Sequence, residues 1–152
     1  MSKLYIAYGS NLSVEQMAYR CPDAKIVGMA ALMDWKLVFR LHATIEPAKG
    51  RIVPVLVWEI SEEDEARLDR YEGYPRYYYK KNLEITMLDL NGKNPKKERA
   101  IVYLMTVGRC IELPTRDYYG TIAGGYERFG FNPTILTSAL REAKEVQHAF
   151  SR

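Results

Sequence analysis

Cysteine and histidine are scarce in this chain, and their scarcity excludes several classes of protein. The two cysteines, Cys21 and Cys110, are too few for a disulfide framework. The two histidines, His42 and His148, lie far apart, and no cysteine or histidine cluster has the spacing of metal ligands. We therefore expect no structural zinc and no metal site.

Long apolar runs and a strong excess of one charge are also missing. No segment approaches the length of a membrane span, and the first four residues carry no apolar signal region. The formal net charge is only +3, and we interpret the basic clusters Lys80–Lys81 and Lys93–Arg99 as solvated side chains. We therefore expect a cytoplasmic protein with no nucleic acid and no membrane among its partners.

Tyrosine, in contrast, is abundant, with twelve residues against four phenylalanines. The clusters are Tyr77–Tyr79 and Tyr118–Tyr119. Because a tyrosine combines an apolar ring with a polar end, it suits the wall of a solvated pocket. Strand propensity and packing at the edge of a core are the alternative explanation.

The hydrophobic pattern predicts an α+β chain in which most strands are consecutive. Strands are expected at 3–8, 26–31, 34–41, 52–60, 77–88 and 99–106, with a turn across 44–50. Helices are expected near 14–19, 62–72, 115–128 and 133–150. Consecutive strands favour a small antiparallel or mixed sheet that curls toward a β-barrel, with helices outside. The length and ordinary composition place all of this in one domain, residues 1–152.

The most informative segment is residues 5–12, Tyr-Ile-Ala-Tyr-Gly-Ser-Asn-Leu, a short strand followed by a glycine turn. Ser13 and Gln16 have the form of a capping box, so a helix is expected to begin directly afterwards. Free N–H groups at a helix N-terminus suit a carboxylate or a developing oxyanion. Gly9 would let a ligand approach the backbone, and Asn11 tolerates left-handed backbone and adds a donor. An ordinary structural corner is the alternative, and no phosphate-loop pattern is present.

Glu72 differs from the other acids because it is expected at the end of a helix among aromatic residues. Tyr71 precedes it, and Tyr74 and the tyrosine triplet follow shortly after Gly73. Desolvation and the helix dipole would both disfavour the charged carboxylate and raise its pKa. A raised pKa suits a group that acts first as a base and then as an acid. A solvated acid at a helix end is the alternative.

The Tyr8–Leu12 corner, the segment Leu68–Gly73 (Leu-Asp-Arg-Tyr-Glu-Gly) and Tyr79 in the next strand occur in an order that resembles the γ-glutamylcyclotransferase-like (AIG2-like) family. The resemblance covers most of the chain. It implies a six- or seven-stranded β-barrel flanked by helices, the γ-glutamylcyclotransferase-like fold. It also implies release of 5-oxoproline from a γ-glutamyl amino acid or amine, without a cofactor.

The resemblance further implies roles for individual residues. Glu72 would be the catalytic residue that takes a proton from the α-amine of the substrate and later returns it to the departing amine. The substrate-binding residues would be Tyr8, Gly9, Ser10, Asn11, Leu12, Tyr79 and Tyr118. A non-catalytic small-molecule-binding or regulatory module on the same fold is the alternative function. The sequence leaves the departing amine and the oligomeric state open.

Overall fold

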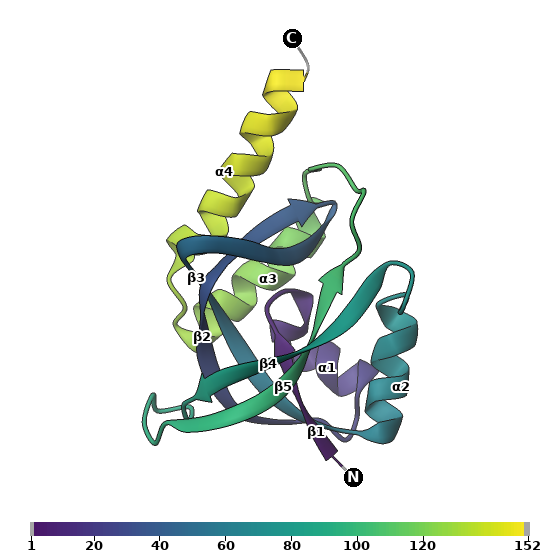
Figure 1. Ribbon diagram of the computed structural model, residues 1–152, viewed down its shortest axis with the longest axis vertical. Coiled ribbons are helices and arrows are strands. Elements are labelled where there is room, and N and C mark those ends of the chain that lie inside the picture. Colours follow the sequence, from purple (N-terminus) through teal and green to yellow (C-terminus); the bar gives the residue numbers. More distant parts are fainter. Residues whose placement is uncertain (1, 151–152) are drawn as a thin grey trace.

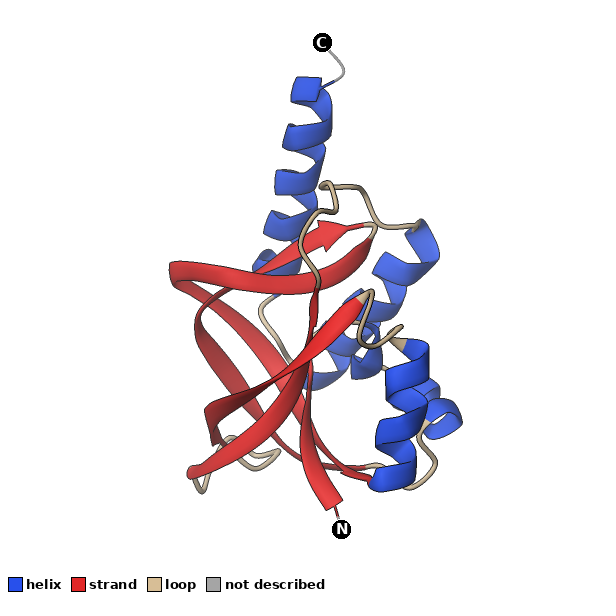
Figure 2. Cartoon of the chain, turned by 45° about the vertical axis from the view of Figure 1, so that its right-hand side comes forward, coloured by secondary structure: helices blue, strands red, loops and turns tan. Residues whose placement is uncertain are grey.

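A strongly curved five-stranded sheet forms the centre of the molecule in the computed structural model, which describes residues 2–150 (Figures 1 and 2). The strands are β1 (Ser2–Ala7), β2 (Lys25–Arg40), β3 (His42–Ser61), β4 (Tyr78–Met87) and β5 (Lys96–Met105). Their spatial order is β2-β3-β1-β5-β4, and β1 runs parallel to β5 while the other neighbours are antiparallel. The expected mixed α+β architecture is confirmed.

Two long bent strands replace several shorter expected elements. The segments 26–31 and 34–41 both belong to β2, whose pairing with β3 is interrupted at Asp34, where φ is 65°. The expected turn across 44–50 is wrong, because residues 44–47 pair with β2 and the chain reverses at Leu41, where φ is 68°. Gly50 instead marks a bulge, where its N–H donates to the Asp34 carboxylate at 2.8 Å. Long-range pairing has outweighed the local turn signal, and it leaves five strands where six or seven were expected.

The sheet curls without closing, so the expected barrel is only a loose description. Its two edge strands, β2 and β4, approach each other where Met29 exchanges both backbone hydrogen bonds with Leu88, at 2.9 and 2.8 Å. Gly28 permits this approach, because a Cβ at that position would lie 2.4 Å from the Leu88 carbonyl oxygen.

Within the described residues, four α-helices and one short 3-10 helix cover the sheet. They are η1 (Ser10–Leu12), α1 (Val14–Arg20), α2 (Glu62–Tyr71), α3 (Arg116–Phe129) and α4 (Pro133–Phe150). The predicted helix starts are confirmed: Ser13, Ser61 and Thr115 each accept a hydrogen bond from the third residue beyond. These local bonds satisfy amides that have no partner within the helix, which is why the caps were readable from sequence.

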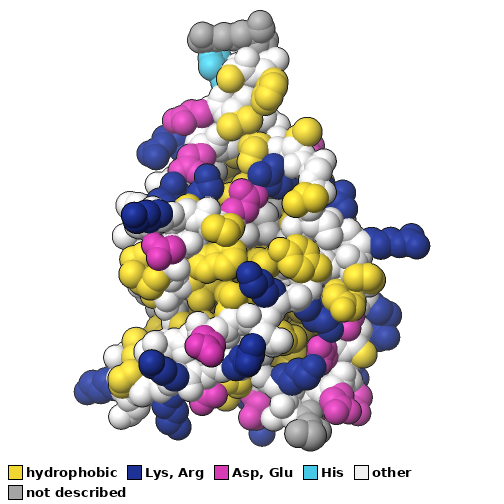
Figure 3. All heavy atoms as spheres, in the orientation of Figure 1, with side chains coloured by type: hydrophobic (Ala, Val, Ile, Leu, Met, Phe, Trp, Pro, Cys, Tyr) yellow, Lys and Arg dark blue, Asp and Glu magenta, His cyan; other side chains and the backbone are white. Residues whose placement is uncertain are grey.

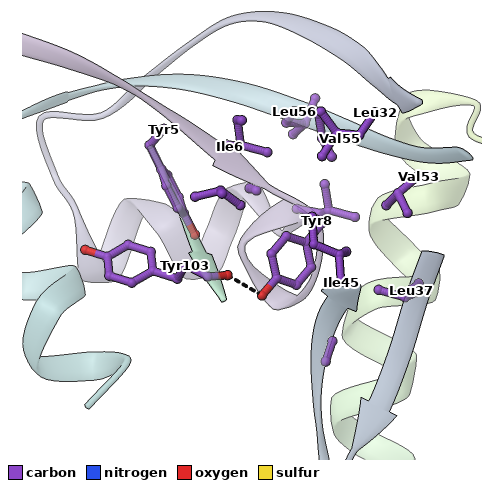
Figure 4. Close-up of a cluster of buried hydrophobic side chains, with 14 of the residues drawn as sticks. Tyr5, Ile6, Tyr8, Leu32, Leu37, Ile45, Val53, Val55, Leu56 and Tyr103 are labelled. Carbon is purple, nitrogen blue, oxygen red and sulfur yellow. Dashed lines mark hydrogen bonds between the residues drawn. The ribbon is translucent and has the colours of Figure 1, made fainter. Parts of the chain in front are cut away.

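The core fills the concave side of the sheet, and tyrosine side chains lie at its margin. Figure 4 shows apolar side chains such as Ile6, Ile45 and Val53 packed together, with Tyr8 and Tyr103 beside them. Helix α4 packs on β2, and its C-terminal part extends away from the body (Figure 1). On the face drawn in Figure 3, basic and acidic side chains are interspersed around apolar surface. Within residues 2–150, no helix is long and apolar enough to cross a membrane.

Candidate active site

A cavity of about 340 Å³ lies between the N-terminal bend, residues 8–12, and the C-terminal end of α2. Its lining residues are Tyr5, Ile6, Tyr8, Gly9, Ser10, Asn11, His42, Ala43, Arg70, Tyr71, Glu72, Gly73, Tyr77, Tyr78, Tyr103 and Tyr118. Of the eight residues that the sequence nominated, the structure therefore brings six to one cavity: Tyr8, Gly9, Ser10, Asn11, Glu72 and Tyr118. Segments more than sixty positions apart in the chain meet here.

The N-terminal bend has unused backbone donors on residues that line the cavity. It folds into η1, where Leu12 N–H donates to the Gly9 carbonyl at 3.0 Å. Within the described part of the chain, no hydrogen bond uses the N–H groups of Gly9, Ser10 or Asn11, although Ser10 and Asn11 are buried. Buried amides without partners are costly, so these donors are suited to a ligand in the cavity. They belong to η1 and the residue before it, whereas the sequence had placed them at the start of the next helix, α1.

Hydrogen bonds of Asn11 hold the N-terminal bend in place. Its amide Nδ2 donates to the Tyr5 hydroxyl at 2.9 Å, and its Oδ1 accepts from Arg20 at 2.6 Å. Its backbone carbonyl accepts from the Trp58 indole at 3.2 Å. The bend does not use the tolerance of Asn11 for left-handed backbone, because Asn11 is not among the residues with positive φ. Its side chain holds the bend in place, and it is already committed to protein partners.

Arg20 links the two halves of the site, and sequence reasoning missed it. Besides the bond to Asn11, its guanidinium lies 3.3 Å from the ring centroid of Tyr71, next to Glu72. A cation over an aromatic face is a favourable contact, which ties α1 to the end of α2. The last residue of a short polar helix carries no sequence signal that separates such a link from a solvated side chain.

The catalytic candidate Glu72 lies at the C-terminal cap of α2, where its N–H donates to the Leu68 carbonyl at 2.8 Å. Gly73 follows with φ of 65°, the left-handed geometry that ends the helix. Burial of the carboxyl raises the pKa of Glu72 to about 7, and the positive charge of Arg20 offsets part of that increase. Among residues 2–150, the Glu72 carboxyl has neither a hydrogen-bond partner nor an ion-pair partner. The carboxyl therefore belongs to the wall of the cavity and has a pKa near neutrality.

Tyrosine hydroxyls fix the opposite wall. Tyr8 donates to the Tyr103 carbonyl at 2.6 Å (Figure 4), and Tyr78 donates to the Ala43 carbonyl at 2.7 Å. The Tyr118 hydroxyl accepts from the Ala43 N–H at 3.0 Å. Burial raises the pKa of Tyr8, Tyr78 and Tyr118 above the ordinary value, so these hydroxyls stay neutral. The wall is aromatic and uncharged, and hydrogen bonds to the backbone hold its hydroxyls.

Two nominated residues do not reach the cavity. Tyr79 is 43% exposed and borders a separate hollow with Trp35 and Lys81, while its neighbour Tyr78 lines the cavity. Successive side chains of a strand point to opposite faces, so a shift of one position changes which tyrosine lines the site. Leu12 is fully buried and packs against Gly125 of α3, so it supports the bend from behind.

His42 and Tyr77 stand at the exposed end of the cavity. Sequence reasoning missed His42, and it pointed to Tyr77 only as a member of the tyrosine cluster 77–79. The His42 Nδ1 shares a hydrogen bond of 2.9 Å with the Tyr77 hydroxyl, and its ring lies 5.3 Å from that of Tyr118. Burial lowers the pKa of His42, which favours the neutral ring. No motif surrounds His42 in the sequence, and only the β2–β3 hairpin brings it to the site.

A curved mixed sheet with helices outside brings a glycine bend and a buried carboxyl to one cavity. The protein is thus a small α+β domain with a titratable carboxyl in the cavity wall. The sequence profile described as "Gamma-glutamyl cyclotransferase, AIG2-like" matches residues 5–125, and the chain belongs to this family.

Named relatives agree with this assignment. A bovine γ-glutamylcyclotransferase is 35% identical over 104 residues, which are 60% of this chain and 55% of that protein. A mouse γ-glutamylcyclotransferase is 32% identical over 115 residues, 68% of this chain and 59% of that protein. The matches thus span little more than half the length of these curated relatives.

Solved structures share the fold. A γ-glutamyl cyclotransferase structure superimposes with a TM-score of 0.74 at 28% identity, covering 91% of this chain and 86% of that chain. A human protein described as uncharacterised gives a TM-score of 0.73 at 29% identity, with the same coverage of both chains.

Proposed function

We propose that this protein is a γ-glutamyl cyclotransferase that releases 5-oxoproline from a γ-glutamyl amino acid or amine. The observation that carries the proposal is the meeting of Glu72, whose pKa is raised to about 7, with the unused N–H groups of the bend at one cavity. Family membership and the names of the relatives support the same reaction.

The N–H groups of Gly9, Ser10 and Asn11 would bind the glutamyl part of the substrate. They suit its α-carboxylate, and they equally suit the oxyanion that develops on the γ-carbonyl oxygen. The aromatic wall around Tyr8, Tyr78 and Tyr118 would hold the glutamyl chain folded back on itself. Holding both reacting groups of one molecule close together lowers the barrier to cyclisation.

Glu72 would move the protons. Its ionised carboxylate takes a proton from the α-ammonium group of the substrate, and the free amine nitrogen then attacks the γ-carbonyl carbon. The bond between that carbon and the departing nitrogen breaks as Glu72 returns the proton to the departing nitrogen. The attacking nitrogen loses a second proton when it becomes the lactam N–H, and Glu72 passes this proton to the departing amine as well. No water is consumed, and the products are 5-oxoproline and the amine in its ammonium form. A pKa near 7 allows the same carboxyl to serve in both directions at neutral pH.

Substitution Glu72→Gln tests this role directly. Gln keeps the size of the side chain but cannot accept the proton, so we expect formation of 5-oxoproline to fall at least about a hundredfold. The product is measured by mass spectrometry with a panel of γ-glutamyl compounds, and circular dichroism confirms that the variant is folded. Full activity in a folded variant would reject the role of Glu72. Binding of these compounds by the natural protein without product would favour the non-catalytic binding module.

A further inference from the structure

Helix α2, which ends at Glu72, has little apolar surface to hold it on the sheet. Of its ten residues, Asp64 and Leu68 are buried, and Leu68 is the apolar member of the two. The first turn is fixed by the capping box of Ser61 and Asp64. The position of the last turn, which carries the Glu72 carboxyl, therefore depends on further contacts of polar side chains.

Lys80 of β4 makes several of these contacts. Its ammonium nitrogen lies 2.8 Å from a Glu65 carboxylate oxygen and 2.9 Å from an Asp69 carboxylate oxygen, and these two acids are one turn apart on α2. The Lys80 side chain is 18% exposed, so solvent screens these pairs less than it screens a surface ion pair. Burial alone would lower the pKa of Lys80, but the bonds to Glu65 and Asp69 outweigh burial and raise the pKa, so the group stays charged.

Lys80 contacts the chain on both sides of Glu72. Asp69 lies three residues before Glu72, and Tyr74, whose ring centroid is 4.3 Å from the Lys80 ammonium nitrogen, lies two residues after it. The Tyr74 N–H also donates to the Asp69 carbonyl at 2.9 Å, which closes the turn that contains Glu72. One ammonium group therefore holds both ends of this turn against β4.

The same contacts connect the end of α2 to the N-terminal bend through Tyr103 of β5. Tyr103 is paired with Lys80 across the two strands, and its hydroxyl donates to Asp69 at 2.5 Å. The Tyr103 carbonyl accepts from the Tyr8 hydroxyl at 2.6 Å, while the Tyr103 hydroxyl points away from Tyr8 (Figure 4). The distance from Glu72 to the bend therefore depends on Lys80, although Lys80 is not among the residues that line the cavity.

We infer that Lys80 is a positioning residue, which fixes the Glu72 carboxyl at the distance from the bend that the proton transfers require. This inference rests on the proposed cyclotransferase reaction. Proton transfer needs hydrogen-bond reach, so a displacement of about 1 Å lowers the rate steeply. Binding of the glutamyl part by the N–H groups of the bend does not involve Lys80, so the effect falls on kcat and not on KM.

Lys80→Met tests the inference, because it removes the ammonium group and keeps the apolar stem. With γ-glutamyl-L-alanine and γ-glutamylmethylamide as substrates, we expect kcat for 5-oxoproline formation to fall at least about tenfold and KM to change by less than about twofold. The fall should be the same for both substrates, because Glu72 serves either departing amine. Lys80→Arg should restore kcat to within about threefold of the natural protein, because a guanidinium can bond to both carboxylates.

Lys3→Met is the matched control. It is the same change of side chain, and Lys3 contacts the same acid, Glu65, at 2.9 Å. Within residues 2–150, however, Lys3 makes no ion pair with Asp69 and no ring contact with Tyr74. We expect kcat to be unchanged in this variant. Urea denaturation gives the free energy of unfolding of each variant, so that kcat is compared between folded proteins.

Unchanged kcat in folded Lys80→Met overturns the inference, because Lys80 would then contribute only to stability. A loss that Lys3→Met shares, or that Lys80→Arg does not restore, also overturns it. If Lys80→Met does not fold, Asp69→Asn weakens the same contact while keeping its shape, and unchanged kcat there overturns the inference. Absence of 5-oxoproline from both substrates with the natural protein rejects the proposed function itself, and the positioning role falls with it.

Discussion

At the scale of single residues, the site depends on how Glu72 is surrounded. Burial raises its pKa to about 7, and the Arg20 charge limits that increase. The same guanidinium bonds to Asn11 and stacks on Tyr71. One side chain therefore couples the position of the bend to the protonation of the carboxyl, which the proposed reaction requires to be ionised at the start.

This coupling predicts a change in pH dependence. Because Glu72 must be ionised to accept a proton, kcat/KM should rise with pH through about 7 in the natural protein. Arg20→Gln removes a charge that favours the ionised form, so the pKa of Glu72 increases and the rise moves to higher pH. A pH profile of 5-oxoproline formation measures this. If kcat/KM falls equally at all pH values and the pH of its rise stays the same, Arg20 acts only by holding the bend and Tyr71 in position.

At the scale of secondary-structure elements, the bend is supported by a close contact with α3. Gly125 of α3 faces Leu12, and a Cβ added to Gly125 would lie 2.5 Å from the Leu12 Cβ. Such a distance requires one element to move. Leu12 directly follows Gly9, Ser10 and Asn11, whose unused N–H groups belong to residues that line the cavity, so a shift of α3 would be transmitted to these donors.

Gly125→Ala should therefore destabilise the protein and lower its activity together. We expect a loss of about 1–3 kcal/mol in the free energy of unfolding, measured by urea denaturation, with a reduced kcat/KM. Gly124→Ala is the control on the same helix, because a Cβ there has no neighbour within 4 Å. It should be neutral or stabilising, since alanine is the better helix former. Equal behaviour of the two variants would contradict the contact.

At the scale of the whole molecule, the curvature of the sheet places the site. The bends in β2 and β3 turn the sheet back on itself until β2 meets β4 at Met29 and Leu88. The same curvature brings His42 and Ala43, at the start of β3, to the cavity beside the end of α2. A flat sheet with the same strand order would leave these groups apart.

The backbone contact between the two sheet edges, at Met29 and Leu88, can be tested by a substitution at Gly28. A Cβ there would lie 2.4 Å from the Leu88 carbonyl, which is backbone and cannot rotate away. Gly28→Ala should lower the free energy of unfolding by about 2 kcal/mol, as overpacking of a close contact does. Because Gly28 does not line the cavity, the folded variant should retain its kcat/KM. Unchanged stability by thermal or urea unfolding would mean that the bridge contributes little.

The sequence by itself determined what depends on neighbours in the chain. Caps such as Ser13 and Thr115 bond to amides three residues away, so they identify helix starts without any knowledge of the fold. The glycine bend and the aromatic setting of Glu72 were visible for the same reason. Tertiary structure alone decided that Tyr78 lines the cavity while Tyr79 lies outside, and that Arg20 joins the halves of the site. Those outcomes depend on strand register and on contacts between distant elements, where moving one residue along a strand reverses the face it occupies.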